Sequence, residues 1–309
     1  MKNFVNLGDF SGRQLTALLE RAIADKKQFK AGKLEPSLTR KTLAMIFEKP
    51  SLRTRVSFEA AMTQLGGHAI YLTNAEIGIG SREAVQDIAR VLARMCDGIM
   101  ARTFRHERVR QLAEHARVPV INALTDYCHP CQAMADLMTA RERFGELAGR
   151  TLAFVGDGNN VARSLAAACA KVGMSFVLAS PEGHRLADEF VASLGEASGY
   201  RWTPEPRQAV AAADVVYTDT WVSMGQEDEK AERLRAFAGF QVSAELMSAA
   251  ADQAIVLHCL PAYRGYEITD EVFEAHAEAI LDQAENRLHF QRTLLDVLMA
   301  RGGIAASGA

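Results

Sequence analysis

The segment after the apolar run 43–47 has the side chains and the position of an anion-binding turn. The run predicts a β-strand, Pro50 ends it, and a helix is expected to begin near Arg53. A helix amino terminus presents N–H groups with a partial positive charge, and Ser51 and Thr54 add hydroxyl donors. The pattern therefore predicts a phosphate site at Ser51, Leu52, Arg53 and Thr54. The alternative is a plain helix start, with Ser51 as an N-cap and Arg53 as a solvated charge.

Three further side chains could bind an anion or polarise a carbonyl group. Arg102 ends the apolar stretch 98–101, where a charge has no packing purpose. His129 precedes Pro130, a residue suited to the first position of a helix, and Gln132 lies in the same turn. Donors of this type can stabilise a carbonyl oxygen as it becomes an oxyanion. A structural arginine paired with an acid and a structural histidine remain as alternatives.

The segment 219–225, further along the chain, has side chains that could bind a free α-amino acid. Asp219 and Ser223 can bind an ammonium group, and Met224 supplies backbone and an apolar wall. The alternative is a loop with a turn-forming Asp and Ser. Cys259 follows the apolar run 254–257, where a buried inert thiol is the usual case and a Cys–His nucleophile is the alternative.

The turn Gly156-Asp157-Gly158-Asn159-Asn160 superficially suggests a dinucleotide-binding loop. Its third glycine is missing, and the next predicted strand ends in Ala179-Ser180-Pro181 rather than in an acid. These two departures argue against an NAD site.

The cysteines argue against a disulfide framework. Five cysteines, at positions 96, 128, 131, 169 and 259, are scattered through a long chain, so reduced thiols are expected. Cys128 and Cys131 have the spacing of a redox or metal motif, but no second such pair completes a zinc site, and we expect no metal.

Composition indicates a globular protein of two domains. The 309 residues are 49% hydrophobic, enough for a core in each domain. A net charge of -3 with interspersed signs gives no broad attraction for nucleic acid or an anionic membrane, so an anion must be held locally. The chain has no apolar stretch of membrane-spanning length and no signal-peptide core at its start, which favours the cytoplasm.

Strand and helix patterns alternate along the chain, which predicts an α/β fold with two parallel sheets flanked by helices. A capping-box pattern at Ser11 predicts a first helix, and a helix near 286–300 is expected to close the chain. We expect domains at 1–145, with 286–301 packing back on it, and at 146–285. Strands are predicted near 43–47, 68–72, 97–101, 119–122, 151–155, 175–179, 214–217, 254–258 and 279–281, and helices in the first half near 53–65, 83–95, 106–116 and 131–144. Because ligands bind at the carboxyl ends of parallel strands, where most of the polar candidates fall, the site is expected in the cleft between the domains.

Four of these segments together resemble the aspartate/ornithine carbamoyltransferase family along nearly the whole chain. They are the phosphate turn, His129-Pro130-Cys131-Gln132, the run 219–225 and His258-Cys259-Leu260-Pro261. Within the family, Ser223-Met224-Gly225 is similar to the members that act on ornithine. The resemblance implies transfer of a carbamoyl group from carbamoyl phosphate to the side-chain amine of L-ornithine, giving L-citrulline and phosphate, without a metal or organic cofactor.

The resemblance also implies a role for each candidate residue. Phosphate would be held by Ser51, Arg53, Thr54 and Arg102, and the carbamoyl group polarised by Arg102, His129, Gln132, Thr54 and Arg287; ornithine would be held by Asn160, Asp219, Ser223 and Met224, with Cys259 and Leu260 at its side-chain amine. No covalent intermediate is needed, because a deprotonated amine can attack the carbamoyl carbon directly.

The sequence departs from the family pattern at two places. The family motif is Ser-Thr-Arg-Thr, and Leu52 occupies its first Thr position, which removes one hydroxyl. The family also has a Gln-x-Gly loop that contacts the carbamoyl phosphate of a neighbouring subunit, and here Glu76 or Gly78 falls at the Gln position.

The family is built on trimers with shared sites, so a homotrimer or a multiple of trimers is expected. Two alternatives to carbamoyl transfer onto ornithine remain. One is a carbamoyltransferase for another amine, such as putrescine or an N-acylated ornithine. The other is a non-catalytic regulatory paralogue, for which Leu52 and the altered loop are the support.

Overall fold

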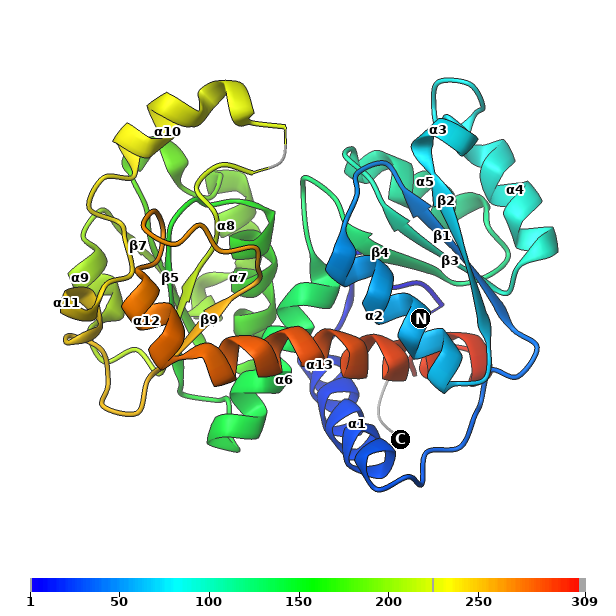
Figure 1. Cartoon of the computed structure of the whole chain (residues 1–309), viewed down its shortest axis with the longest axis horizontal. Coiled ribbons are helices and arrows are strands. Elements are labelled where there is room, and N and C mark those ends of the chain that lie inside the picture. Colours follow the sequence, from blue (N-terminus) through cyan, green and yellow to red (C-terminus); the bar gives the residue numbers. More distant parts are fainter. Residues whose placement is uncertain (1, 224, 306–309) are drawn as a thin grey trace. The chain divides into compact units, whose positions relative to one another are not determined.

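The computed structural model describes residues 2–223 and 225–305. The chain divides into two compact units, Met1–Met138 with Asn286–Ala309, and Thr139–Glu285 (Figure 1). Each unit contains one parallel sheet. The prediction of an α/β fold with two parallel sheets is therefore confirmed.

The first unit is built on a four-stranded sheet in the order β2-β1-β3-β4. One face, with Ala44, Ile46, Ile99 and Ala101, packs on apolar side chains of α4 and α5. The carboxyl-terminal part of the chain also contacts this unit, since the rings of Phe4 and Phe290 lie 5.9 Å apart. The strands are β1 Thr42–Phe47, β2 His68–Thr73, β3 Gly98–Arg102 and β4 Val120–Leu124; the helices are α1 Gly12–Lys30, α2 Leu52–Gln64, α3 Asn74–Ile77, α4 Val85–Met95, α5 His106–His115 and α6 Pro130–Phe144, whose last residues belong to the second unit.

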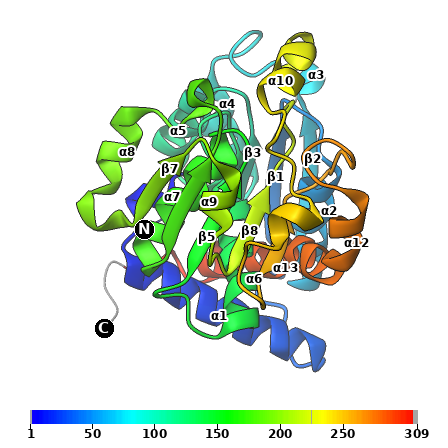
Figure 2. The same ribbon diagram turned by 90° about the vertical axis from the view of Figure 1, so that its left-hand side faces the viewer.

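The second unit is built on a five-stranded sheet in the order β7-β6-β5-β8-β9 (Figure 2). Side chains alternate between its faces. Val155, Val177 and Val216 join the cluster around α9, whereas Phe154 and Tyr217, on the other face, stack at 5.3 Å. The strands are β5 Thr151–Val155, β6 Ser175–Ala179, β7 Tyr200–Thr203, β8 Val215–Thr218 and β9 Ile255–His258; the helices are α7 Asn160–Val172, α8 Asp188–Leu194, α9 Pro206–Val210, α10 Lys230–Ala236, α11 Ala244–Met247, α12 Asp270–Ala275 and α13 Ala277–Leu295, whose last ten residues belong to the first unit.

Short helical turns complete the described chain. They are the 3-10 turns Leu7–Asp9, Glu182–His184, Glu196–Ser198 and Glu227–Glu229, and a π-helical turn at Asp296–Ala300. Among the described residues, no helix is both long enough and apolar enough to cross a membrane.

Two sequence-based element predictions are wrong. The strand near 279–281 lies inside α13, where Ile280 is buried and Leu281 is 59% exposed, as expected for neighbours on a helix rather than for a buried strand. A run of three apolar residues is too short to separate the two periods. The prediction also missed β7, a four-residue edge strand with no fully buried side chain.

The capping-box prediction at Ser11 is confirmed. The Ser11 hydroxyl accepts a hydrogen bond from the Gln14 N–H at 3.3 Å, and the Gln14 side chain accepts one from the Ser11 N–H at 2.9 Å. This reciprocal pair satisfies two backbone donors and fixes the first residue of α1.

Candidate active site

Both sheets place the candidate residues where their strand order reverses. In the first unit the order reverses between β1 and β3, which are followed or ended by the Ser51 turn and Arg102. In the second it reverses between β5 and β8, which precede Asn160 and Asp219. Parallel sheets bind ligands at such points, outside the carboxyl ends of the strands. Each unit therefore carries a separate candidate binding surface.

The phosphate turn of the first unit is assembled around Thr54. The Ser51 hydroxyl accepts a hydrogen bond from the Thr54 N–H at 3.3 Å and donates to the Thr54 hydroxyl at 3.1 Å. Nη1 of Arg102 approaches the same hydroxyl at 3.5 Å. Thr54 and Arg102 are buried, whereas Arg53 is half-buried and the Leu52 side chain is 74% exposed. The turn thus combines hydroxyls, a helix start and a buried guanidinium, a suitable set for phosphate.

A second arginine of the first unit contacts the carbonyl-polarising candidates. Arg287 is buried, and its Nη1 donates to Oε1 of Gln132 at 2.7 Å. Burial, with the positive charges of Arg287, Arg102 and Lys49, holds the pKa of His129 well below its usual value of 6.5. The imidazole is therefore neutral at physiological pH, so it can donate one hydrogen bond to a carbonyl oxygen but carries no charge of its own.

Lys49 is a site candidate that sequence reasoning missed. The side chain is buried, its Nζ lies 2.5 Å from Oδ1 of Asp126, and it stacks over the Phe104 ring at 4.3 Å. A buried ammonium group immediately before the phosphate turn adds to the positive potential there. Its position two residues before Ser51, where a strand ends, was the available signal.

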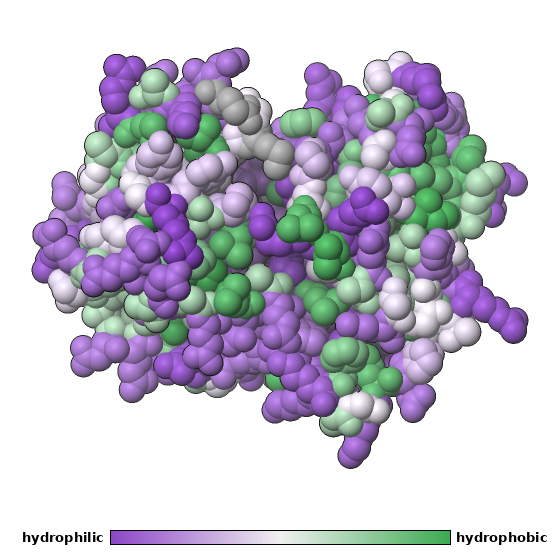
Figure 3. All heavy atoms as spheres, in the orientation of Figure 1, coloured by the Kyte–Doolittle hydropathy of each residue, from purple (hydrophilic) through white to green (hydrophobic). Residues whose placement is uncertain are grey.

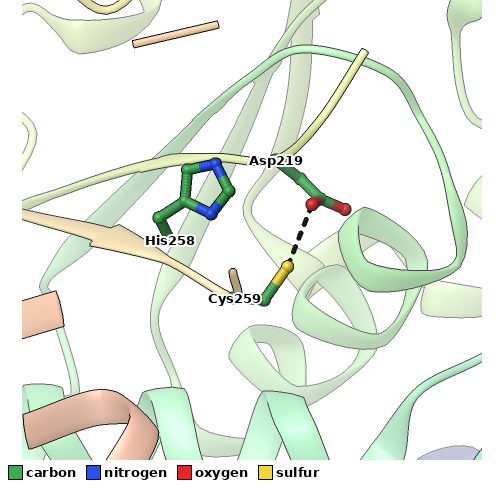
Figure 4. A group of neighbouring side chains, drawn as sticks. All are labelled: Asp219, His258 and Cys259. Atoms are coloured by element: carbon green, nitrogen blue, oxygen red, sulfur yellow. Dashed lines mark hydrogen bonds between the residues drawn. The ribbon is translucent and has the colours of Figure 1, made fainter. Parts of the chain in front are cut away.

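In the second unit, Asp219 and Cys259 are in direct contact (Figure 4). The Cys259 thiol donates to Oδ1 of Asp219 at 2.9 Å, and the Thr220 N–H donates to the same oxygen at 2.8 Å. Nδ2 of Asn159 donates to Oδ2 at 2.8 Å. A carboxylate accepts about four hydrogen bonds, so Oδ2 can accept another from a ligand ammonium group. Sequence reasoning placed Asn160 at the ligand and missed its neighbour Asn159.

The same corner contains three possible metal ligands. Donor atoms of Asp219, His258 and Cys259 all lie within 4.8 Å of one another. Both ring nitrogens of His258 have protein partners, since Nε2 lies 3.0 Å from Oε1 of the buried Glu267 and Nδ1 accepts the Leu260 N–H at 2.9 Å. A metal ion would have to displace one of these bonds, so the donor set does not fit a resident metal.

The remaining candidates are placed as follows. Leu260 follows Cys259 with a φ of 60°, a left-handed conformation that is uncommon for a residue with a side chain. The Ser223 N–H donates to the side chain of Gln226 at 3.1 Å. Gly78 ends α3 with a φ of 60°, where a Cβ would come within 2.7 Å of the Arg82 side chain. Met224 lies outside the described residues.

The CxxC cysteines have the environment of structural thiols. Burial raises the pKa of Cys131 to about 12, and its thiol donates to the Asn122 carbonyl at 3.4 Å. Cys128 is also buried, and its sulfur accepts from Nδ2 of Asn122 at 3.2 Å. The five cysteines all lie in the described part of the chain, and none of them forms a disulfide. A thiol with a raised pKa is a poor nucleophile and a poor metal ligand.

Comparison with known proteins covers both units. Two family models match, the carbamoyl-P binding domain at residues 2–142 and the Asp/Orn binding domain at residues 148–298 of aspartate/ornithine carbamoyltransferases. The ornithine carbamoyltransferase of Symbiobacterium thermophilum is 49% identical over 304 residues, 97% of this chain and 98% of the relative. That of Bacillus subtilis is 47% identical over 97% of this chain and 95% of the relative.

A solved structure agrees with these relatives. The ornithine carbamoyltransferase of Pyrococcus furiosus matches with a TM-score of 0.93 and 45% identity, over 98% of both chains. Matches of this identity over nearly the full length, in sequence and in structure, determine the family. The chain belongs to the aspartate/ornithine carbamoyltransferase family.

Proposed function

We propose that this chain transfers the carbamoyl group of carbamoyl phosphate to the side-chain amine of L-ornithine, giving L-citrulline and phosphate. The full-length relatives described above are named for this activity. Residues 1–145 with 286–301 would bind carbamoyl phosphate, and residues 146–285 would bind ornithine. The substrates named by the two family models, which match residues 2–142 and 148–298, support the boundary near 145, and the grouping of Asn286–Ala309 with the first unit supports the assignment of the last helix.

The observation that carries the proposal is the pair of buried arginines in the first unit. Arg102 contacts the phosphate turn through Thr54, and Arg287 contacts Gln132. The positive charges of both guanidinium groups lower the pKa of the buried His129. Carbamoyl phosphate needs this arrangement, because it has an anionic phosphate on one side of a carbonyl carbon and an oxygen that gains negative charge on the other.

Each group then has a role in the transfer. Ser51, Arg53, Thr54 and Arg102 hold the phosphate, with Leu52 contributing its backbone N–H. The neutral His129, Gln132 and Arg287 bind the carbamoyl group. The deprotonated amine attacks the carbonyl carbon and the new C–N bond forms. The C–O bond to phosphate then breaks, and the departing phosphate takes the proton that the amine nitrogen loses. Phosphate leaves as the anion for which the turn is built.

Ornithine would be bound in the second unit. Oδ2 of Asp219 is available to the α-ammonium group, with Asn160, Ser223 and Met224 around the amino-acid end. Cys259 and Leu260 would position the side-chain amine. The thiol already donates to Asp219, which supports a positioning role rather than a nucleophilic one.

An amine panel tests the choice of acceptor. The purified protein is given carbamoyl phosphate with ornithine, putrescine or N-acetylornithine, and the carbamoylated products are measured. We expect citrulline to form at a kcat/KM at least about a hundredfold above that for the other amines, since the charge of the buried Asp219 carboxylate would have no ligand cation to balance it. Preference for putrescine or N-acetylornithine would identify a different carbamoyltransferase, and no product with any amine would favour a regulatory paralogue.

We further propose a homotrimer, on family resemblance, in the cytoplasm. Leu52 and Val56 are 74% and 54% exposed on α2, and hydrophobic side chains are visible on the surface over its first turns (Figure 3). Covering such a patch with another subunit removes apolar surface from water, and Gly78 would approach the neighbour's substrate. Five cysteines without a disulfide among them suit a reducing compartment. Light scattering should give three times the 33.7 kDa chain mass, or a multiple of it.

A further inference from the structure

Helix α13 carries two buried side chains that connect the carbamoyl candidates to the phosphate turn. Arg287 and Gln291 are one turn apart and on the same face of the helix. Nε of Arg287 donates to Oε1 of Gln291 at 2.8 Å, and Nε2 of Gln291 donates to the Ser57 hydroxyl at 2.7 Å. The Ser57 hydroxyl donates in turn to the Thr54 carbonyl at 3.2 Å. Gln291 is fully buried.

The same guanidinium group contacts Gln132 on its other side. Nη1 of Arg287 donates to Oε1 of Gln132, and Nε2 of Gln132 donates to Oδ1 of the buried Asp136 at 2.8 Å. One hydrogen-bonded chain therefore runs from Asp136 through Gln132, Arg287 and Gln291 to the first turns of α2. All of its members belong to the first unit.

We propose that Gln291 is a positioning residue for carbamoyl transfer, which sets the guanidinium plane of Arg287 relative to the phosphate turn. The inference rests on the proposed function. A guanidinium group recognises its partner through a planar fork, so its orientation decides whether Nη atoms point at the carbamoyl oxygen. Gln291 fixes Nε from one side, while Ser57 holds the amide of Gln291. The groups that bind the two halves of carbamoyl phosphate are thereby held in one geometry.

The amide is the side chain that this position requires. It accepts from Arg287 and donates to Ser57 at the same time. A glutamate would accept from Arg287 but would have no proton for Ser57, and its charge would offset the positive charge of the arginine. A methionine has a similar size and would make neither bond.

A purely structural role is the competing explanation, because the same bonds join α13 to α2. The chain offers a matched control. Nη1 of Arg292 donates to Oε1 of Gln64 at 2.8 Å, again a guanidinium–amide bond between α13 and α2. Gln64 ends α2 and makes this bond without Arg287. Gln64→Met therefore removes a comparable hydrogen bond between the two helices and leaves the hydrogen bonds from Asp136 through Arg287 to Ser57 unchanged.

The test compares Gln291→Met, Ser57→Ala and Gln64→Met in steady-state citrulline formation, below the melting temperature of each variant. Misplacement of a catalytic group by about 1 Å can cost about a hundredfold in rate. We expect kcat to fall about tenfold to a hundredfold in Gln291→Met and less in Ser57→Ala, with the KM for ornithine changed less than about threefold, and kcat in Gln64→Met to stay within about twofold.

A double-mutant cycle distinguishes positioning from a structural role, because it measures whether the effect of Gln291→Met on kcat depends on Arg287. If Gln291 acts through Arg287, then Gln291→Met in an Arg287→Met background should lower kcat by less than about twofold further. Multiplied losses would overturn the proposal, as would equal kcat values in Gln291→Met and Gln64→Met. Should Gln291→Met fail to fold, Ser57→Ala carries the same comparison with Gln64→Met. A wild-type protein that forms no citrulline would instead overturn the proposed function, and the positioning role with it.

Discussion

Two buried arginines supply positive charge beside the phosphate turn and the carbamoyl candidates. Arg102 and Arg287 are buried and permanently charged, and with Lys49 and burial they keep His129 neutral. A neutral imidazole can donate to a carbonyl oxygen without competing for the phosphate. In the proposed site the anion would therefore be recognised by guanidinium groups, hydroxyls and a helix start. We expect no loss of phosphate binding as the pH rises through about 6.5, where a solvent-exposed histidine would lose its proton.

The first residue-scale prediction concerns Arg102. Its guanidinium approaches Thr54 and would contact both the phosphate and the developing oxyanion. Loss of one such donor typically costs about 2.7–4 kcal/mol in the transition state, so Arg102→Ala should lower turnover about a hundredfold or more. Steady-state kinetics test this, with Arg55→Ala as the control, because Arg55 is an exposed arginine in the first turn of α2, beside the phosphate turn. A loss of only a few-fold would show that Arg102 is structural.

The second concerns the pH dependence of stability through His129. The pKa in the unfolded chain is near 6.5 and the folded value lies well below it. As pH falls below about 6.5 the unfolded chain therefore binds more protons than the folded one, and the free energy of unfolding decreases. The free energy of unfolding, measured with urea, should fall more between about pH 7.5 and about pH 5 in the wild type than in His129→Asn. Parallel pH curves for the two proteins would contradict a buried neutral imidazole.

The third concerns Asp219. Its carboxylate accepts bonds from Cys259, Asn159 and Thr220 and would also receive the α-ammonium group. Asp219→Asn removes the charge at nearly constant size, so the KM for ornithine should rise at least about tenfold, while inhibition by inorganic phosphate stays unchanged. An equal weakening of both would identify Asp219 as a structural residue.

The proposed phosphate site depends on how α2 begins, and the proposed carbamoyl site depends on how α6 begins. Ser51 caps α2, and Pro130 is the first residue of α6, with His129 immediately before it. In both cases the helix start follows a strand, so side chains and N–H groups gather at one edge of the sheet. The positions of these residues followed from the sequence because caps, prolines and strand ends are local signals.

Leu52 tests the α2 start. Its side chain is 74% exposed and contributes nothing to the core of the chain, whereas its backbone belongs to the helix start that would bind phosphate. Leu52→Thr adds one hydroxyl, so the affinity for carbamoyl phosphate should stay unchanged or improve at most about tenfold, the equivalent of about 1.4 kcal/mol. If the wild type fails to bind at millimolar concentration and the variant restores binding, the regulatory paralogue becomes the better description.

The cysteines at the α6 start give a second test. The Cys131 thiol has a pKa raised to about 12 and bonds to the Asn122 carbonyl. The proposed transfer uses neither thiol, so Cys128→Ala combined with Cys131→Ala should keep kcat within about threefold, with a loss of stability of about 1–3 kcal/mol. Abolished activity in a folded double variant would revive a redox or metal role.

What the sequence could not predict is mostly non-local. The bond between Gln291 and Ser57 joins residues 234 positions apart, and a single sequence shows only that each lies on a helix. Asn159 and Asn160 are adjacent, and only the folded turn shows which side chain reaches Asp219. The missed β7 and the misplaced strand at 279–281 are both short segments, where helix and strand periods are hardest to separate.

The molecule contains two parallel sheets, and we propose that each unit binds one of the two substrates. A net charge of -3 means that the anion is attracted by a local site rather than by the protein as a whole. The proposed transfer requires both substrates to be present at once, because the carbamoyl carbon would pass directly from the phosphate oxygen to the amine nitrogen. We therefore expect no covalent intermediate between the carbamoyl group and the protein.

The most direct test of that account follows the carbamoyl carbon itself. Carbamoyl phosphate labelled with ¹³C at the carbonyl is mixed with ornithine and the protein, and the label is monitored by NMR together with phosphate release. We predict that the label appears in citrulline in step with phosphate, in equal amounts, and that Arg102→Ala slows both together. Phosphate release without labelled citrulline, or label retained on the protein after the small molecules are removed, would contradict direct transfer to ornithine.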